Sequence, residues 1–226
     1  MLIFRLRVLI LLVFVTSSFS ASATIVDVNV SDLEGTLISD AVVELIPEHS
    51  MPSSAINNHE MRQQNRIFQP FVLAVQQGDK VNFPNFDRTR HHVYSFSPAK
   101  PFELKLYVGK AEEPIEFAQP GIVAIGCNIH DYMQAFIYVA QSPLYAVSDN
   151  KGHVSFNDLI PGTYNVKIWH PWQKVPVIAA PIVLTGETKQ TLELQFDIEH
   201  QDKPTSPQAG FALINQSTQI EFANAT

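Results

Sequence analysis

Residues 126–133, "GCNIHDYM", place a thiol, an imidazole and a thioether close together in the chain. Cys127 is the only cysteine among 226 residues, His130 follows three positions later, and Met133 comes three positions after that. Thiolate and thioether sulfur are soft ligands that suit copper, and imidazole also binds copper. One cysteine, two histidines and a weak axial methionine form the ligand set of a mononuclear blue-copper site. This segment therefore offers three of the four ligands of such a site.

The single thiol excludes several other centres. It cannot form a disulfide within the chain, and iron–sulfur clusters, cysteine-rich structural zinc sites and two-cysteine dinuclear copper centres all need more thiolates. A zinc ion bound by one cysteine and two histidines would leave a coordination position open for catalysis. No nearby carboxylate stands out as the general base of such a zinc enzyme, however, and Met133 would have no role in it. The residues therefore favour copper.

Two short strands must position these side chains. Residues 121–127 and 133–140 are apolar segments of strand length, in which side chains point alternately to opposite faces. Cys127 has the same parity as Val123 and Ile125, so its thiol is expected on the apolar face. On the second segment the residues that share a face are Met133, Ala135, Ile137 and Val139. We therefore expect Cys127 and Met133 on the core side of adjacent strands, with His130 in the connecting loop.

A further histidine must come from a distant strand, and residues 81–96, "VNFPNFDRTRHHVYSF", supply it. This segment and the Cys-x-x-His-x-x-Met segment together resemble the cupredoxin family of plastocyanin, azurin and amicyanin, and the short spacing is most like that of amicyanin. The matching residues are Gln77, Gly78, Asp79, Val81, Phe83, Asn85, Asp87, His91, Cys127, His130 and Met133. The resemblance covers residues 67–140. It implies a Greek-key β-sandwich in which His91, Cys127 and His130 hold one copper ion and Met133 is the weak axial ligand.

One position departs from the family pattern. Cupredoxins usually carry an asparagine directly after the first histidine ligand, where it ties two loops together, but this chain has His92 there. We assign the ligand to His91 because Val93 then falls where the family has an apolar residue. His92 remains the alternative ligand. Asn85 or Asn128 could supply the hydrogen bonds that tie the loops.

The rest of the chain also reads as short strands separated by turns, so the predicted fold class is all-β. We expect residues 24–30 and 41–47 to pair across the turn "DLEG", and residues 182–196 to form a hairpin around Thr185 and Gly186. Residues 48–66 are polar without a clear period, which favours a crossover or linker. Residues 199–226 are rich in polar residues and are expected to be a flexible C-terminal tail.

Two segments that flank the predicted copper domain have a resemblance of their own. They are similar to the carboxypeptidase-regulatory or transthyretin-like β-sandwich, whose pattern is D-x-x-G followed by Ala and Val, and later D-x-x-G followed by Phe, Leu, Pro-Gly and Tyr. The matching residues are Asp32, Gly35, Ala41, Val43, Asp149, Gly152, Phe156, Leu159, Pro161, Gly162 and Tyr164. This implies a second, immunoglobulin-like sandwich from residues 24–50 and 141–198, with the cupredoxin domain inserted. The alternative is that 24–50 are extra strands of the copper domain.

The N-terminus has the pattern of an export signal. Arg5 and Arg7 precede an apolar run that is too short to span a membrane, and small residues follow up to Ala23. We therefore expect a signal peptide over 1–23, cleavage near Ala23, a periplasmic or otherwise exported protein, and no membrane span in the mature chain. Removal of the two arginines takes the net charge from −7 to −9. Such an acidic chain is a poor candidate for binding nucleic acid.

These features predict a one-electron carrier and not an enzyme, because four protein ligands would leave no position for a substrate. The alternative is a module that delivers, stores or senses copper without carrying electrons. The resemblance places a redox partner protein near His130, with Ile129 and Tyr132 beside it. An acidic cluster of Glu112, Glu113 and Glu116 is by default a solvated edge, and the alternative is a docking patch for a basic redox partner.

Overall fold

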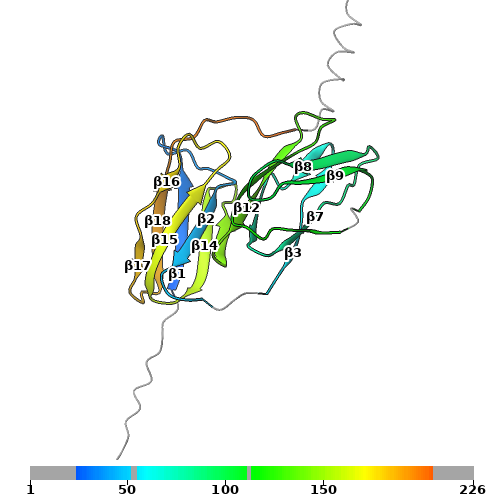
Figure 1. Ribbon diagram of the computed structural model, residues 1–226. Coiled ribbons are helices and arrows are strands. Elements are labelled where there is room, and N and C mark those ends of the chain that lie inside the picture. The colour runs from blue at the N-terminus through cyan, green and yellow to red at the C-terminus, as the bar shows by residue number, and fades with distance from the viewer. Residues whose placement is uncertain (1–23, 52–54, 111–112, 206–226) are drawn as a thin grey trace, which may run out of the picture.

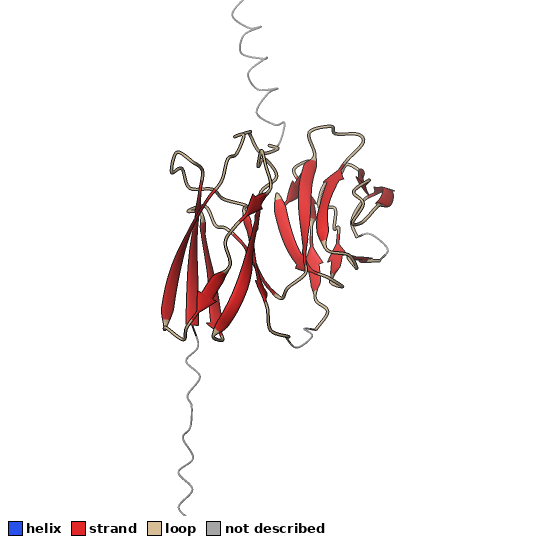
Figure 2. Ribbon diagram, turned by 60° about the vertical axis from the view of Figure 1, so that its left-hand side comes forward, coloured by secondary structure: helices blue, strands red, loops and turns tan. Residues whose placement is uncertain are grey.

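The computed structural model describes residues 24–51, 55–110 and 113–205. Within these residues the protein is all-β and contains no helix, as the sequence predicts. The strands gather into two β-sandwiches that lie side by side, and both Figure 1 and Figure 2 show the two stacks of sheets. No helix in the described ranges is long and apolar enough to cross a membrane. The predicted signal peptide lies outside the described residues.

The first sandwich is built from the two ends of the described chain. One sheet has the order β14-β1-β18, and the other has the order β13-β2-β15-β16, with β17 also pairing with β15. The strands are β1 (Thr24–Ser31), β2 (Val42–Pro47), β13 (Leu144–Val147), β14 (His153–Leu159), β15 (Gly162–Trp169), β16 (Val177–Ile178), β17 (Ile182–Leu184) and β18 (Lys189–Gln195). Their alternating apolar side chains fill one core, which includes Val28, Leu45 and Tyr164. This core joins residues that are more than 100 positions apart in the sequence.

The second sandwich is built from the middle of the chain. Its larger sheet has the order β6-β12-β11-β8-β9, which faces a sheet of order β10-β7-β3 and the small ribbon β4-β5. The strands are β3 (Asn58–Glu60), β4 (Arg62–Gln64), β5 (Ile67–Gln69), β6 (Val72–Gln76), β7 (Lys80–Asn82), β8 (His91–Ser95), β9 (Phe102–Tyr107), β10 (Ile115–Glu116), β11 (Gly121–Gly126) and β12 (Gln134–Ala140). Their core contains Cys127 and Met133 among aliphatic and aromatic side chains.

A third apolar cluster joins the two sandwiches. It contains Val42 of β2 and Tyr138 of β12, and the Trp169 ring lies 5.9 Å from the Tyr138 ring between centroids. Glu44, only 1% exposed, accepts hydrogen bonds from the Tyr138 hydroxyl and from the backbone N–H groups of Gln141 and Ser142, each at 2.7 Å. A buried carboxylate is stable only when its oxygens are paired in this way. The boundary between the sandwiches is therefore packed and hydrogen-bonded.

Two of the predicted strand pairings are wrong. β1 pairs with β14 and β18, and β2 pairs with β13 and β15, so these consecutive strands lie in opposite sheets of the first sandwich. In the same way β17 pairs with β15 while β18 pairs with β1. Alternation of apolar residues shows which face of a strand is buried, but it does not show which strand is the neighbour. A short turn can cross from one sheet to the other as well as form a hairpin.

The prediction of a linker over residues 48–66 is wrong for residues 58–64. These residues form β3 and β4, between which Met61 is fully buried, and β4 also buries Gln63 completely. The side-chain amide of Gln63 donates to the carbonyl oxygen of Phe83 at 3.0 Å. A buried glutamine that is hydrogen-bonded in this way looks polar in the sequence, which hides the two-residue period of the strand.

The beginning of the predicted C-terminal tail contacts the first sandwich. His200 Nε2 lies 2.8 Å from a carboxylate oxygen of Asp32, and Lys203 forms an ion pair with Asp40. The hydrogen bond from His200 is the largest contribution that lowers the pKa of Asp32 to about 2. Residues 199–205 therefore have defined partners, and the remainder of the predicted tail, 206–226, lies outside the described residues.

Candidate metal centre

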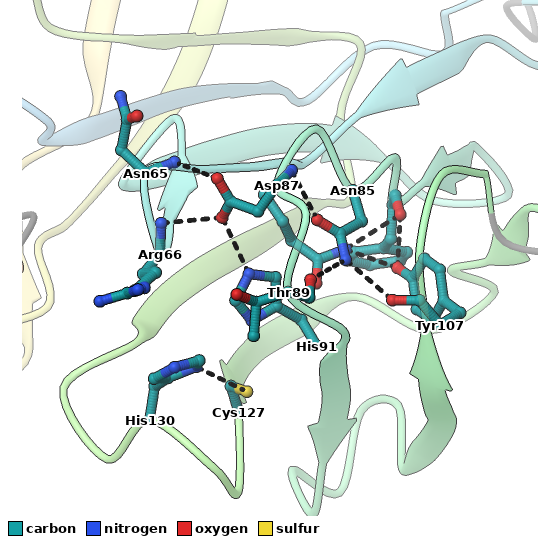
Figure 3. Close-up of polar contacts among 11 residues, drawn as sticks. Asn65, Arg66, Asn85, Asp87, Thr89, His91, Tyr107, Cys127 and His130 are labelled. Atoms are coloured by element: carbon teal, nitrogen blue, oxygen red, sulfur yellow. Dashed lines mark hydrogen bonds and ion pairs between the residues drawn. The ribbon is translucent and has the colours of Figure 1, made fainter.

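Among the described residues, one group of side chains could hold a metal ion; it lies in the second sandwich and consists of His91, Cys127 and His130. One potential ligand atom from each of these residues lies within 4.8 Å of those of the other two. His91 begins β8, Cys127 directly follows β11, and His130 lies in the loop between β11 and β12. Figure 3 shows the three side chains converging, with Sγ of Cys127 3.9 Å from Nδ1 of His130. His91, which precedes Cys127 by 36 positions in the sequence, thus lies beside Cys127 and His130 in the fold.

The loop that holds Cys127 and His130 is closed by its own backbone. The N–H of Met133 donates to the carbonyl oxygen of His130 at 2.8 Å, and the N–H of Cys127 donates to that of Met133 at 3.2 Å. Val123, Ile125 and Cys127 are all buried, as their shared parity predicts. Met133 is fully buried in the same apolar core as Cys127. The sequence-based placement of both sulfur atoms on the core side of adjacent strands is confirmed.

The His91 ring is held so that one nitrogen has a partner and the other does not. Its Nε2 lies 2.8 Å from Oδ2 of Asp87, and because a carboxylate accepts, Nε2 carries the proton. Nδ1 is then the unprotonated nitrogen with a free lone pair. It is buried and has no hydrogen-bond partner. An orphaned buried acceptor beside a thiol and a second imidazole fits a metal ligand, since a bound ion would satisfy it.

Asp87 positions His91 and is the residue whose role the sequence did not reveal. Besides His91, its carboxylate accepts hydrogen bonds from the backbone N–H groups of Asn65 at 2.8 Å and Arg66 at 2.9 Å (Figure 3). Burial would raise the pKa of Asp87, but the hydrogen bonds from Arg66, His91 and Asn65 outweigh it and lower the pKa. The only sequence signal was its match to the family pattern four residues before His91. Asp87 therefore stays ionised and fixes the ring.

Asn85 ties the surrounding loops. Its side-chain amide donates to the carbonyl oxygens of Thr89 at 2.9 Å and Tyr107 at 2.8 Å, and its oxygen accepts from the N–H of Asp87 at 2.9 Å. Of the two asparagines proposed for this task from the sequence, Asn85 is buried and makes these bonds, whereas Asn128 is exposed. The missing asparagine after His91 is thus compensated from an earlier position in the chain.

His92, the alternative ligand, lies away from this group. Adjacent strand residues point to opposite faces, and the His92 Nε2 is 2.9 Å from the carboxylate of Glu103 on β9. Its ring lies 5.5 Å from the Tyr94 ring between centroids. The Nδ1 atom of His92 is also buried without a partner, but it does not belong to the group formed with Cys127 and His130. The geometry therefore places His91, and not His92, beside the thiol.

His130 lies between the buried site and the surface. Its ring is 5.0 Å from the His91 ring and 5.8 Å from the Tyr132 ring, measured between centroids. Burial, and then the nearby His91 and Arg66, lower the pKa of His130, so its imidazole is available in the neutral form that binds metals. Three exposed apolar side chains lie on the loops that carry the site: Phe86 (59% exposed), Ile129 (45%) and Tyr132 (38%).

Comparison with known proteins gives structural matches that each cover less than half of this chain. They include a copper-containing nitrite reductase from Thermus scotoductus (22% identity, TM-score 0.35, 42% of this chain and 25% of that one). They also include a purple cupredoxin from Nitrosopumilus maritimus (18%, 0.30, 36% and 99%) and the amicyanin of Paracoccus versutus (14%, 0.32, 46% and 100%). This chain spans only a quarter of the nitrite reductase chain. No family model matches, no curated protein matches, and nothing found supports the resemblance of the flanking segments to a carboxypeptidase-regulatory-like sandwich.

Proposed function

We propose that this protein binds one copper ion and carries single electrons. The observation that carries the proposal is the meeting of a buried thiol with two imidazoles, one of which keeps a buried nitrogen without any partner. Nδ1 of His91, Sγ of Cys127, Nδ1 of His130 and the thioether of Met133 would hold the ion. A thiolate with two imidazoles and a thioether suits copper better than other first-row metals. Copper would supply a one-electron step between Cu(I) and Cu(II).

The residues around the site suit electron transfer because they hold the ligands still. Asp87 fixes the His91 ring, Asn85 ties the loops beneath it, and the backbone bonds of the 127–133 loop hold Cys127 and His130. The apolar core around Cys127 and Met133 excludes water from the sulfur ligands. A rigid, dry site changes little between oxidation states. Four protein ligands would leave no position for a substrate, which supports a carrier and not an enzyme.

The exposed loops offer a place for the redox partner. His130 is the one group member that is not fully buried, and Ile129 and Tyr132 are exposed on either side of it in the chain. We propose that electrons enter and leave through His130. We also propose that the protein acts in an exported, oxidising compartment after cleavage near Ala23, which rests on the N-terminal sequence alone.

We propose further that the two sandwiches are two domains, with the copper domain inserted in a discontinuous one. Separate apolar cores support this division, one from residues 26–45 and 154–198 and one from residues 61–139. The resemblance of the first sandwich to a carboxypeptidase-regulatory-like domain stays a prediction from its sequence pattern.

Voltammetry of the copper-loaded mature protein tests the carrier function. We expect a reversible one-electron couple and fast self-exchange, and we expect the His130→Ala variant to weaken copper binding and slow the exchange. The matched control is Tyr132→Phe, which keeps the ring beside His130. Slow or irreversible redox cycling, together with ready release of Cu(I) to a chelating acceptor, would instead favour the delivery or storage role.

A further inference from the structure

The arginines of this chain are distributed very unevenly. Apart from Arg5 and Arg7 in the N-terminal segment, the sequence has four arginines, and all of them lie between residues 62 and 90. They are Arg62, Arg66, Arg88 and Arg90, and all four are exposed. The remaining basic residues of the chain are lysines, and the net charge is −7. An acidic protein thus carries these four arginines on strand β4 and on two loops, 65–66 and 85–91, that hold His91 in place.

The first loop holds the backbone of Arg66 in a fixed conformation. Asn65 and Arg66 form the two-residue turn between β4 and β5, with φ angles of 57° and 59°, as a type I′ hairpin turn requires. Both backbone N–H groups donate to Asp87, so the turn is pinned to the metal site. In Figure 3 the Arg66 side chain lies on the same side of the site as His130. Arg66 also acts electrostatically on both His130 and Tyr132.

The second loop runs from Asn85 to His91 and adds the other arginines. Phe86 is 59% exposed, and the guanidinium of Arg62 lies over its ring at 5.8 Å. Arg88 and Arg90 occupy the stretch between Asp87 and His91. Among the described residues, none of the three arginines Arg66, Arg88 and Arg90 forms an ion pair with a carboxylate of this chain, whereas Arg62 pairs with Glu60. Asp131 is the exposed opposing charge on the loop of His130.

We propose that these loops form a docking surface for a redox protein with an acidic face. We define the arginine rim as Arg62, Arg66, Arg88 and Arg90. Arg62 lies over the exposed Phe86 ring, Arg66 acts on His130 and the exposed Tyr132, and Arg88 and Arg90 lie on the loop that joins Phe86 to His91. An arginine fork pairs with a carboxylate through two parallel hydrogen bonds, and it is less strongly hydrated than a lysine. Arg66, Arg88 and Arg90, which form no ion pair among the described residues, therefore match aspartates and glutamates around a partner's redox centre. The inference rests on the proposed function and names the partner's surface.

The arginine rim calls for an acidic partner, whereas the acidic cluster of Glu112, Glu113 and Glu116 would call for a basic one. Glu112 lies outside the described residues, and Glu116 on β10 lies opposite Lys80 on β7, a basic neighbour. Opposite charges steer two proteins together and orient them on encounter, and the effect falls with added salt. Docking through the arginine rim would bring the partner's redox centre to His130. One electron would then pass between the two centres, so that one is oxidised and the other reduced by the same electron.

The test uses gold electrodes coated with monolayers that end in carboxylate or in amine. The copper-loaded mature protein is adsorbed on each, and the electron-transfer rate is measured by voltammetry. We expect at least roughly tenfold faster exchange on carboxylate, because the rim turns the site toward that surface. On the amine monolayer we expect the acidic protein to adsorb through other faces and to exchange electrons slowly with the electrode. Adsorption of the metal-free protein on the carboxylate layer, followed by surface plasmon resonance, gives a readout that needs no copper.

Charge-reversal variants locate the surface. Arg88→Glu/Arg90→Glu is compared with Lys151→Glu/Lys174→Glu, which makes the same change in net charge on the first sandwich. We expect the arginine variant to lose the fast exchange and the adsorption on carboxylate, with its visible absorption unchanged, and the lysine variant to keep them. Equal behaviour of the two variants with an intact couple would overturn the docking surface alone. No reversible couple on any electrode would overturn the carrier function instead. Binding of the wild type to phosphatidylglycerol vesicles but not to the carboxylate layer would also contradict the proposal.

Discussion

Asp87→Ala is the substitution that probes the support of the metal site most sharply. It removes three hydrogen bonds at once, to the N–H groups of Asn65 and Arg66 and to Nε2 of His91. Asn65 and Arg66 are exposed, so water replaces the carboxylate there, and each loss costs about 1 kcal/mol. The His91 side chain is 0% exposed, so its Nε2–H keeps no partner, which costs about 1–3 kcal/mol. The metal-free variant should thus be less stable by about 3–5 kcal/mol.

Asp87→Asn is the matched control. An amide oxygen in the place of Oδ2 still accepts from Arg66 and His91, and only the bond to the exposed Asn65 is lost. We therefore expect a loss of only about 1 kcal/mol in the free energy of unfolding. The bond to His91 also keeps the proton on Nε2 and leaves Nδ1 free for a metal.

Copper affinity should follow the same order. Residues that orient a histidine ligand typically contribute about 10–100-fold to metal affinity, so Asp87→Ala should weaken copper binding by that factor and Asp87→Asn by less than about tenfold. Urea unfolding of the metal-free proteins and competition titration with a copper chelator measure the two effects. If the alanine and asparagine variants behaved alike in both assays, the assignment of Asp87 as the group that orients His91 would be wrong.

Three other substitutions test separate parts of the molecule. Met133→Leu should change the unfolding free energy by less than about 1.5 kcal/mol, because the volume is conserved, yet shift the redox potential; an unchanged potential would argue against an axial thioether. Tyr138→Phe removes one of three donors to Glu44 and should lower the free energy of unfolding by about 0.5–1.5 kcal/mol. Glu44→Ala leaves the buried N–H of Ser142 without a partner and should lower it more, as measured by urea unfolding. The reverse order would contradict the hydrogen-bonded boundary between the two sandwiches. His170 is buried, and this desolvation lowers its pKa to about 4. The pKa of this imidazole in the unfolded chain is near 6.5. The stabilisation from keeping His170 neutral is therefore complete above pH 6.5. As the pH falls from 6.5 toward 4, the free energy of unfolding should drop by about 2–3 kcal/mol. A His170→Asn variant with an equally steep loss of stability between pH 6.5 and pH 4 would exclude this cause.

The short segments around the site were predictable because strand alternation fixes side-chain faces. The parity of Val123, Ile125 and Cys127 was enough to place the thiol in the core, and the same holds for Met133. Partner choice was not predictable: β1 alternates and β2 is buried on both faces from Val42 to Leu45, and neither pattern shows that the two strands lie in opposite sheets. Pairing depends on packing between distant residues, which one sequence does not display.

The support of the site was harder to read than its ligands. Asp87 accepts hydrogen bonds from backbone N–H groups that are over 20 positions earlier in the chain. Almost every residue type carries a backbone N–H, so the sequence does not show which ones bind Asp87. Gln63 is fully buried on a strand that looks like a polar linker, because a hydrogen bond to Phe83 replaces its contact with water. The contacts of Asp87 and Gln63 form only in the folded chain, so they cannot be predicted before the fold is known.

The visible spectrum of the copper-reconstituted mature protein tests the central claim most directly. If Cys127 Sγ binds copper together with His91 and His130, an intense thiolate-to-Cu(II) band should appear with one copper per chain, and Cys127→Ser should abolish it. A spectrum without this band at full copper occupancy, or a band that survives in the serine variant, would contradict the account.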